Sequence, residues 1–314
     1  MSQRRTVVLI IVLVLVVLVA ISVGAGLLVA RFEPKYGDRV ALIRVEGIIT
    51  SGRRSPGFLD RGGAGAEHIV DLLESFRKDK SVKSAVLRIN SPGGSAAGSQ
   101  EIYQEILKVR RSGKKITVSM GDVAASGGYY VASAADRIYA DAATLTGSIG
   151  VIMETTDLHE LLGRVGIDLV TIKSGQHKDI GSFSRPMTQE ERRILQGLVD
   201  DVHDQFVADV SAGRKLPKKD VQKLADGRVY TGRQALKLKL VDRIGTLADA
   251  MRAAADDAGI KGEFKVTEYE REPGVLDMLF GMTEAKLSGW LWRNGLLEGV
   301  ADSLLRMDST LEAR

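Results

Sequence analysis

The sequence contains no cysteine and few histidines, and both shortages exclude or disfavour several kinds of metal and catalytic site. Without cysteine the 314-residue chain has no disulfide, no thiolate metal site and no cysteine nucleophile. The four histidines, His68, His159, His177 and His203, are scattered and form neither an HExxH motif nor a close pair. P-loop and GxGxxG fingerprints are also missing. We therefore expect no metal and no other cofactor.

A concentration of charge of one sign is missing as well. The formal net charge is only +4, and the positive residues are dispersed rather than gathered in a stripe with aromatic residues. This pattern does not favour nucleic acid binding. Hydrophobic residues make up 44% and charged residues 27% of the chain, as in ordinary globular proteins. The length suits one membrane segment followed by one or two compact domains.

The N-terminal region is the one long hydrophobic run. Residues 7–23 are almost all Val, Leu and Ile, and with residues 24–30 the run is long enough to cross a hydrocarbon core of ~30 Å as a helix. The alternative is a cleaved signal peptide with the small residues 23–25 at its cleavage site. The run is longer than the usual apolar core of such a peptide. We therefore predict a cytoplasmic head and a transmembrane anchor at residues 1–31.

The charges around this run bear on its orientation. Arg4 and Arg5 precede it, but Arg31, Lys35 and Arg39 lie just past its other end, so the charge rule is nearly balanced. Long downstream domains generally translocate regardless of flanking charge. We therefore predict a single-pass protein of the inner or plasma membrane with its main domain on the extracytoplasmic side.

The rest of the chain alternates between strand and helix patterns. The expected strands are residues 40–49, 83–89, 115–120, 137–140, 148–153, 168–173 and 240–244. The expected helices are residues 67–77, 99–110, 126–135, 158–165, 188–213, 217–224, 232–238 and 248–258. Such alternation predicts an α/β fold with a mainly parallel sheet and flanking helices. We place one domain at residues 32–258, and a C-terminal extension at 259–314 for oligomer or membrane contact.

Two glycine-rich loops follow expected strands, where α/β sheets bind their ligands. The first is Asn90-Ser91-Pro92-Gly93-Gly94, either a plain tight turn or half of an oxyanion hole. In the second loop, residues 121–130, small residues surround Ser126 at the start of an expected helix. Ser126 is therefore either a helix cap or a nucleophile, and the N–H of Gly127 is a natural oxyanion donor.

A serine nucleophile needs a base, and no histidine here comes with a convincing orienting carboxylate. A lysine serves when burial lowers the pKa of its ammonium group. Lys178 lies just past the expected strand at 168–173. Spacing alone does not distinguish it from a solvated surface lysine.

Five sequence blocks together resemble the short, single-domain form of the bacterial signal peptide peptidase A family, within the clan of Clp-type proteases and crotonases. The blocks, in the expected order within residues 40–258, are NSPGG (90–94), GDVAASGGYY (121–130), TGSIGV (146–151), IKSGQHKDI (172–180) and DGRVY (226–230). NSPGG alone is only moderately specific, because Clp-type proteases share it. The resemblance implies a crotonase- and Clp-protease-like fold.

The resemblance also implies a role for each matched residue. Ser126 matches the nucleophile, Lys178 its general base, and Ser148 a hydroxyl that orients that lysine. The N–H groups that match the oxyanion hole are those of Gly93 or Gly94 and of Gly127. The implied enzyme is a serine endopeptidase with a Ser–Lys dyad.

The implied substrates are remnant signal peptides and other apolar peptides at the membrane. The resemblance further implies a ring-like homo-oligomer, in which some members complete the dyad across a subunit boundary. Two rival interpretations remain: a crotonase-type acyl-CoA enzyme on the same fold, and a scaffold protein with an unused site. A third option, within the protease class, is broader housekeeping of membrane proteins.

Overall fold

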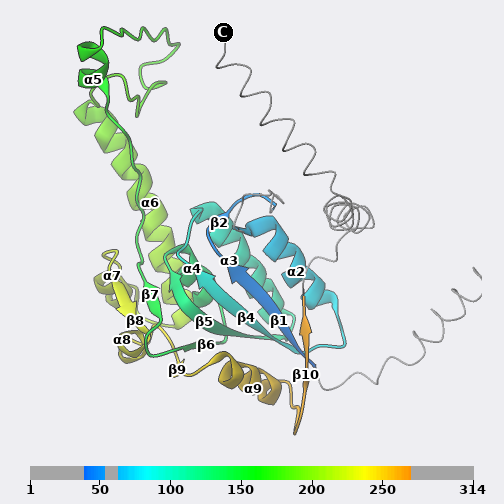
Figure 1. Cartoon of the computed structure of the whole chain (residues 1–314). Helices are drawn as coiled ribbons and strands as arrows, with labels where there is room; N and C mark the ends of the chain where they lie inside the picture. Colours follow the sequence, from blue (N-terminus) through cyan, green and yellow to red (C-terminus); the bar gives the residue numbers. More distant parts are fainter. Residues whose placement is uncertain (1–38, 54–62, 270–314) are drawn as a thin grey trace, which may run out of the picture. The chain divides into compact units, whose positions relative to one another are not determined.

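The computed structural model describes residues 39–53 and 63–269 (Figure 1). The predicted anchor at residues 1–31 and the whole chain after Tyr269 lie outside the described residues. Within the two described ranges, no helix is both long and apolar enough to cross a membrane. The single-pass anchor therefore stays a prediction.

An eight-stranded, mainly parallel sheet forms the centre of the described part. Its strands are β1 (Arg39–Glu46), β4 (Ser84–Ser91), β5 (Lys115–Ala125), β6 (Arg137–Ala140), β7 (Leu145–Gly147), β8 (Val229–Thr231), β9 (Arg243–Ile244) and β10 (Lys265–Glu268). The order β10-β1-β4-β5-β6-β9 is parallel throughout, and β7 pairs with β5 and, antiparallel, with β8. A separate parallel pair joins β2 (Ile49–Thr50) and β3 (Ala64–Gly65). Since β10 pairs with β1, the sheet continues beyond residue 258.

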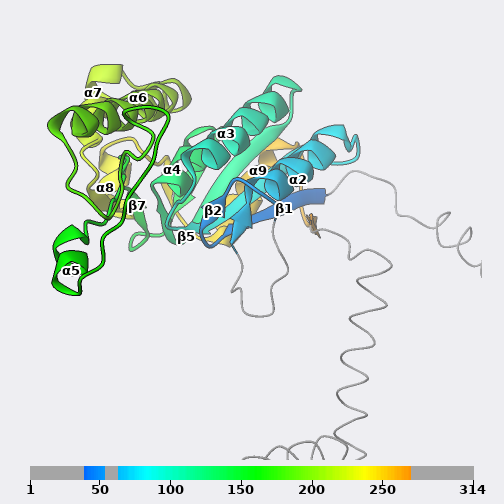
Figure 2. The ribbon, with the colours of Figure 1, turned by 90° about the horizontal axis from the view of Figure 1, so that it is seen from above.

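Helices cover both faces of this sheet. The helices of the described part are α2 (Ala66–Lys78), α3 (Ala96–Arg111), α4 (Gly127–Ser133), α5 (His159–Arg164), α6 (Gln189–Arg214), α7 (Lys218–Leu224), α8 (Gly232–Lys237) and α9 (Leu247–Asp257), of which α5 lies away from the sheet. Side chains such as Ile43 and Leu87 pack in the core under α2 and α3, which lie side by side in Figure 2. Their chain neighbours Leu42 and Val86 point to the other face and pack against α9. Burial on both faces explains why these strands are almost continuously apolar in sequence.

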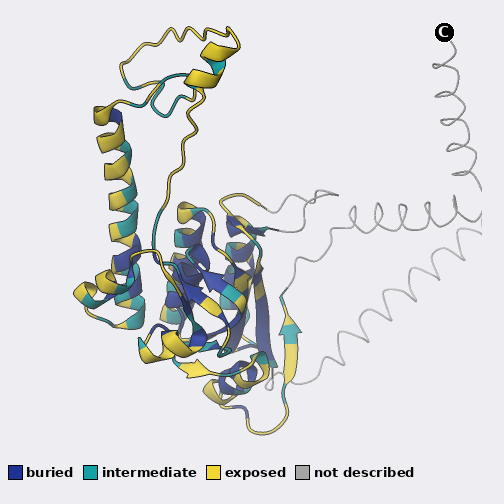
Figure 3. Cartoon of the chain, turned by 60° about the vertical axis from the view of Figure 1, so that its left-hand side comes forward, coloured by how far each residue is buried: buried dark blue, intermediate teal, exposed yellow. Residues whose placement is uncertain are grey.

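A long segment between β7 and α6, residues 150–187, projects from the sheet and its helices (Figures 1 and 3). We call it the arm. It contains one short helix, α5, and most of its side chains are exposed. The predictions of strands at 148–153 and 168–173 were wrong. Apart from the buried Ile149, their apolar side chains find no sheet edge, and Ile172 is 96% exposed, so the local pattern had no partner with which to form a ladder.

The start of helix α6 follows its sequence signal. The Thr188 hydroxyl accepts a hydrogen bond from the N–H of Glu191 at 3.1 Å, and the Glu191 carboxylate accepts one from the N–H of Thr188 at 2.9 Å. This reciprocal pair is the capping box that the sequence predicts, and it satisfies two backbone donors at the end of the helix. The helix runs 26 residues from the arm to the body of the sheet.

Candidate active site

A sharp turn joins strand β5 to helix α4, and Ser126 occupies it. Its backbone has φ 52° and ψ −122°, in a region that favours glycine. The N–H of Ser126 donates to the carbonyl of Gly147 at 2.9 Å, and the N–H of Tyr130 donates to the carbonyl of Ser126 at 2.9 Å. The surrounding structure thus holds a serine in an unfavourable backbone conformation, as happens where a side chain must be aimed.

The side chain of Ser126 is not used as a helix cap. Ser126 occupies the capping position of α4, but its hydroxyl accepts no hydrogen bond from the first turn of the helix. The residue is half-buried, so its hydroxyl is neither enclosed in the core nor fully solvated. Of the two sequence interpretations, the structure therefore removes the capping one and leaves the Oγ atom available for chemistry.

The glycine-rich loop after β4 lies directly against Ser126. A Cβ atom placed on Gly93 would lie 2.8 Å from the Cβ of Ser126 and 2.7 Å from the backbone nitrogen of Gly127. A Cβ atom placed on Gly127 would lie 3.3 Å from the nitrogen of Gly94. The three glycines predicted as oxyanion residues therefore gather beside the serine, with no room for a side chain between them.

The two glycines of the first loop are not equivalent donors. The N–H of Gly93 donates to the Ser91 hydroxyl at 3.1 Å, within the loop itself. Gly94 has φ 148°, and a side chain there would collide with the backbone of Ile49. This leaves the N–H groups of Gly94 and Gly127, rather than that of Gly93, as the donors beside Ser126.

Ser148 comes close to Ser126 through the sheet. Strand β7 runs parallel to the end of β5, pairing Ala125 with Gly147, and Ser148 is the next residue along the chain. Its backbone also has positive φ, 50°, and its N–H donates to the carbonyl of Arg228 at 2.9 Å. Ser126 and Ser148 thus both have positive φ, and each directly follows one of two paired strands, β5 and β7. Such conformations are typically kept where function needs them.

Lys178 lies on the arm, in the turn of residues 175–182. Its backbone N–H donates to the carbonyl of Gly175 at 3.1 Å, and its side chain is exposed. Its ammonium makes no hydrogen bond or ion pair with residues 39–53 or 63–269. The described part of its own chain therefore does not provide the burial that a lysine base needs.

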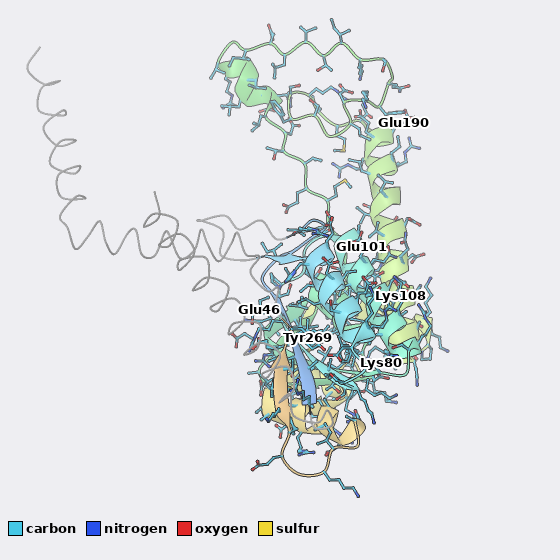
Figure 4. The ribbon with its side chains drawn as sticks, turned by 90° about the vertical axis from the view of Figure 1, so that its right-hand side faces the viewer. Glu46, Lys80, Glu101, Lys108, Glu190 and Tyr269 are labelled. Atoms are coloured by element: carbon cyan, nitrogen blue, oxygen red, sulfur yellow. The ribbon has the colours of Figure 1, made fainter. Side chains whose placement is uncertain are left out.

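The turn of Lys178 is held at the outer end of α6, where Figure 4 labels Glu190. The His177 Nε2 atom is 3.8 Å from a carboxylate oxygen of Glu190. The inner half of the same helix packs on α4, where the rings of Phe206 and Tyr130 stack with centroids 4.5 Å apart. Roughly 24 Å of helix separates Glu190 from Phe206 at 1.5 Å per residue. The Ser126 and Lys178 side chains of one chain are thus not brought together.

Two polar residues beside the site were not predicted from sequence. Ser91 binds the N–H of Gly93, and its place inside the NSPGG block was the available signal. Ser99 is fully buried, donates to the carbonyl of Ser95 at 2.8 Å, and lies against the Cα of Gly127. No local pattern distinguished Ser99, because its contact with Gly127 joins two separate helices. In the described ranges, no three His, Asp or Glu side chains lie together as metal ligands.

Two protein-family models match overlapping parts of this chain. The model of peptidase family S49 matches residues 108–261, and that of Clp protease matches residues 63–146. A Synechocystis sp. protein named "Putative protease" is 42% identical over 222 residues, which are 71% of this chain and 75% of that protein. The chain belongs to peptidase family S49. The sheet and the Clp protease match together confirm the predicted Clp-protease-like α/β fold.

Two further relatives agree with membership of S49. A Methanocaldococcus jannaschii protein, also named "Putative protease", is 37% identical over 218 residues, 69% of each chain. An Enterococcus faecium protein named "Putative signal peptide peptidase SppA" is 36% identical over 230 residues, 73% of this chain and 65% of that one. The resemblance to the signal peptide peptidase A family is therefore confirmed, and with it the class of serine protease.

Proposed function

We propose that this S49 protein is a membrane-anchored serine endopeptidase in which Ser126 is the nucleophile and Lys178 the general base. The observation that carries the proposal is the β5–α4 turn, where an uncapped serine at φ 52° stands beside the backbone nitrogens of Gly94 and Gly127. A nucleophile next to preorganised N–H donors is the arrangement that acyl transfer requires.

In the proposed reaction the same groups act in two steps, formation of an acyl-enzyme and its hydrolysis. The Oγ atom of Ser126 attacks the peptide carbonyl while the Lys178 amine takes the hydroxyl proton. The N–H groups of Gly94 and Gly127 hold the oxyanion of the tetrahedral intermediate. The C–N bond then breaks, and Lys178 gives its proton to the leaving amine. Water attacks the acyl-enzyme by the same route and releases the second product and the free serine.

The base is proposed to come from a neighbouring copy of the chain, oriented there by Ser148. In one chain the turn of Lys178 lies far from Ser126 along α6, which supports a partner subunit as the acceptor of the arm. The arm also exposes large apolar side chains that a neighbour would cover. They are Ile152, Met153, Leu158, Leu161, Val165, Ile167, Leu169, Val170, Ile172 and Phe183. Docking would bury them and exclude water from the lysine.

The proposed substrates are signal peptides left in the membrane after cleavage, and other apolar peptides. Two features support this class: the E. faecium relative carries the name of a signal peptide peptidase, and the apolar run at residues 7–30 would tether the enzyme at the bilayer. Tethering raises the effective concentration of a membrane-bound substrate. We place the protein in the inner or plasma membrane with its catalytic domain on the extracytoplasmic side.

Active-site labelling tests the proposed function directly. The full-length protein in lipid nanodiscs is treated with a fluorophosphonate and then digested and analysed by mass spectrometry. We expect one adduct, on the peptide that contains Ser126, and loss of cleavage of an apolar signal peptide in step with labelling. Labelling at another residue, or cleavage that persists after complete labelling of Ser126, would contradict the proposal. An inert protein that binds an acyl-CoA would favour the crotonase-type rival instead.

The oxyanion site gives a second prediction, the replacement of Gly127 by alanine. The new methyl group meets Ser99 and the nitrogen of Gly94, so the donors beside Ser126 must move. We expect kcat to fall about 100-fold, as when one oxyanion donor is lost. We also expect the free energy of unfolding to fall by about 1–3 kcal/mol from overpacking. Kinetics below the melting temperature and denaturant titration measure the two effects separately.

The matched control is the same change at Gly197. This glycine is exposed inside α6, and no heavy atom lies within 4 Å of the added Cβ. Gly197→Ala should leave kcat unchanged and stabilise the protein by about 0.5–1 kcal/mol through its better helix propensity. Full activity in Gly127→Ala would show that Gly127 is not an oxyanion donor.

A further inference from the structure

The turn that carries Lys178 is fastened by a network of charged side chains. Asp179, the next residue, accepts two hydrogen bonds from the forked guanidinium of Arg185, one from Nε at 2.9 Å and one from a terminal nitrogen at 2.8 Å. The ammonium of Lys173 donates to the same carboxylate at 2.6 Å and to the carbonyl of Gln176 at 2.9 Å. Lys173 before the turn and Arg185 after it thereby bind the same Asp179 carboxylate.

The same guanidinium continues to helix α6. Arg185 Nη1 donates to a Glu191 carboxylate oxygen at 2.9 Å, and Nη2 donates to the other oxygen. Glu191 is also the capping-box residue of α6, and its side chain is only 3% exposed. Arg185 therefore joins a carboxylate beside Lys178 to a carboxylate fixed in the first turn of a 26-residue helix. We name Asp179, Arg185 and Glu191 the clasp.

The two carboxylates of the clasp stay ionised well below neutral pH. The hydrogen bonds from Arg185 lower the pKa of Glu191 to about 2 and hold the pKa of Asp179 well below its ordinary value. Both folded-state pKa values lie below those of unfolded carboxylates. The clasp therefore contributes its full stability above about pH 5 and loses it as the pH falls through the folded pKa values.

Within its own chain, the described part of the arm has few other contacts to hold it in place. Most residues from 151 to 176 are exposed, and the helix α5 contains no buried residue. A base on a freely moving turn would have to be ordered in every catalytic cycle. Prior ordering of a catalytic group removes that entropic cost from the reaction barrier. Bidentate pairing suits this task, because it fixes direction as well as distance.

We propose that Arg185 is a positioning residue for Lys178: it locks the 175–182 turn to the N-terminus of α6 and so presents the lysine to the nucleophile. This inference rests on the proposed Ser126–Lys178 dyad. A lysine at position 185 keeps the charge but loses the planar fork, so it cannot hold two carboxylates in one geometry. The turn should then move while the fold of the sheet stays intact.

The test uses the full-length protein in nanodiscs with Arg185→Lys, and Asp179→Asn as a second variant that keeps the size of its side chain. We expect kcat for a fluorogenic peptide to fall about 10- to 100-fold with KM within about twofold, because the base is misplaced and the substrate site is not. The rate at which Ser126 reacts with the fluorophosphonate should fall by the same factor. Hydrogen exchange at the amides of Lys178, Ile180 and Ser182 should speed up.

Arg164→Lys is the matched control, because Arg164 lies on the same arm, its side chain is 79% exposed, and it forms an ion pair with Glu160. It should match wild type in every measurement. Lys178→Ala separates the two hypotheses. If it abolishes labelling while Arg185→Lys and Asp179→Asn keep wild-type kcat, the positioning role is overturned and the dyad stands. If Lys178→Ala labels at the wild-type rate, the dyad falls and the positioning role falls with it.

Discussion

Replacing Ser126 by glycine is expected to abolish cleavage and at the same time to stabilise the protein. Loss of the nucleophile should lower kcat/KM by about 10⁴–10⁶, as for other serine nucleophiles. The stability gain follows from the backbone: Ser126 is held at φ 52° and ψ −122°, a conformation that glycine adopts with little strain. Relief of such strain is worth about 1–3 kcal/mol, less the entropy that glycine loses on folding.

Ser126→Ala is the companion variant. Alanine removes the hydroxyl but keeps the Cβ atom, so activity should fall as far as in the glycine variant while the strain remains. Thermal unfolding of the two variants in the same detergent should therefore give a higher melting temperature for glycine. Equal melting temperatures would contradict the assignment of strain to this turn. Residual cleavage near the wild-type rate in either variant would remove Ser126 from the mechanism.

Replacing Lys178 by alanine is expected to lower kcat by about 10²–10⁴, the usual contribution of a general base. The loss should be greater than for Lys173→Ala, which changes the other lysine of the arm. The melting temperature should stay close to that of wild type, because the Lys178 side chain is exposed and its ammonium makes no hydrogen bond or ion pair with the described residues. Kinetics and a thermal melt on the same sample measure both effects.

Mixing the two inactive chains tests where the base comes from. If Lys178 serves Ser126 of a neighbouring copy, co-expressed Ser126→Ala and Lys178→Ala chains form some sites with both groups intact. In a randomly mixed closed ring with head-to-tail contacts, about one quarter of the sites recover. Mixed assemblies should then regain about one quarter of wild-type activity. If the dyad forms within one chain, every site lacks one member and the mixture stays inactive.

Much of the fold could be predicted because its signals are local. The strands near residues 40–46, 84–89 and 115–120 are largely apolar, which is typical of a parallel sheet buried on both faces. The capping box at Thr188 involves two residues three positions apart, so a short stretch of sequence contains the whole interaction. Ser126 could be placed at a strand-to-helix turn for the same reason.

The remaining features depend on contacts between distant segments. The expected strands at 148–153 and 168–173 have suitable residues, but a strand needs an edge to pair with, and the arm has none. The choice of Gly94 over Gly93 as the proposed oxyanion donor depends on which N–H the Ser91 hydroxyl already binds. Both outcomes are set by geometry that local residue patterns do not encode.

By itself the sequence determined the family blocks, the alternation of strands and helices, and a short set of residues for the chemistry. Only the tertiary structure decided how those residues are distributed: Ser126 and its glycines on the sheet, Lys178 on a clasped turn at the far end of α6. The physical reason is that backbone preferences act over a few residues. The distance between two side chains 52 positions apart is set instead by the rigid helix and the packed core between them.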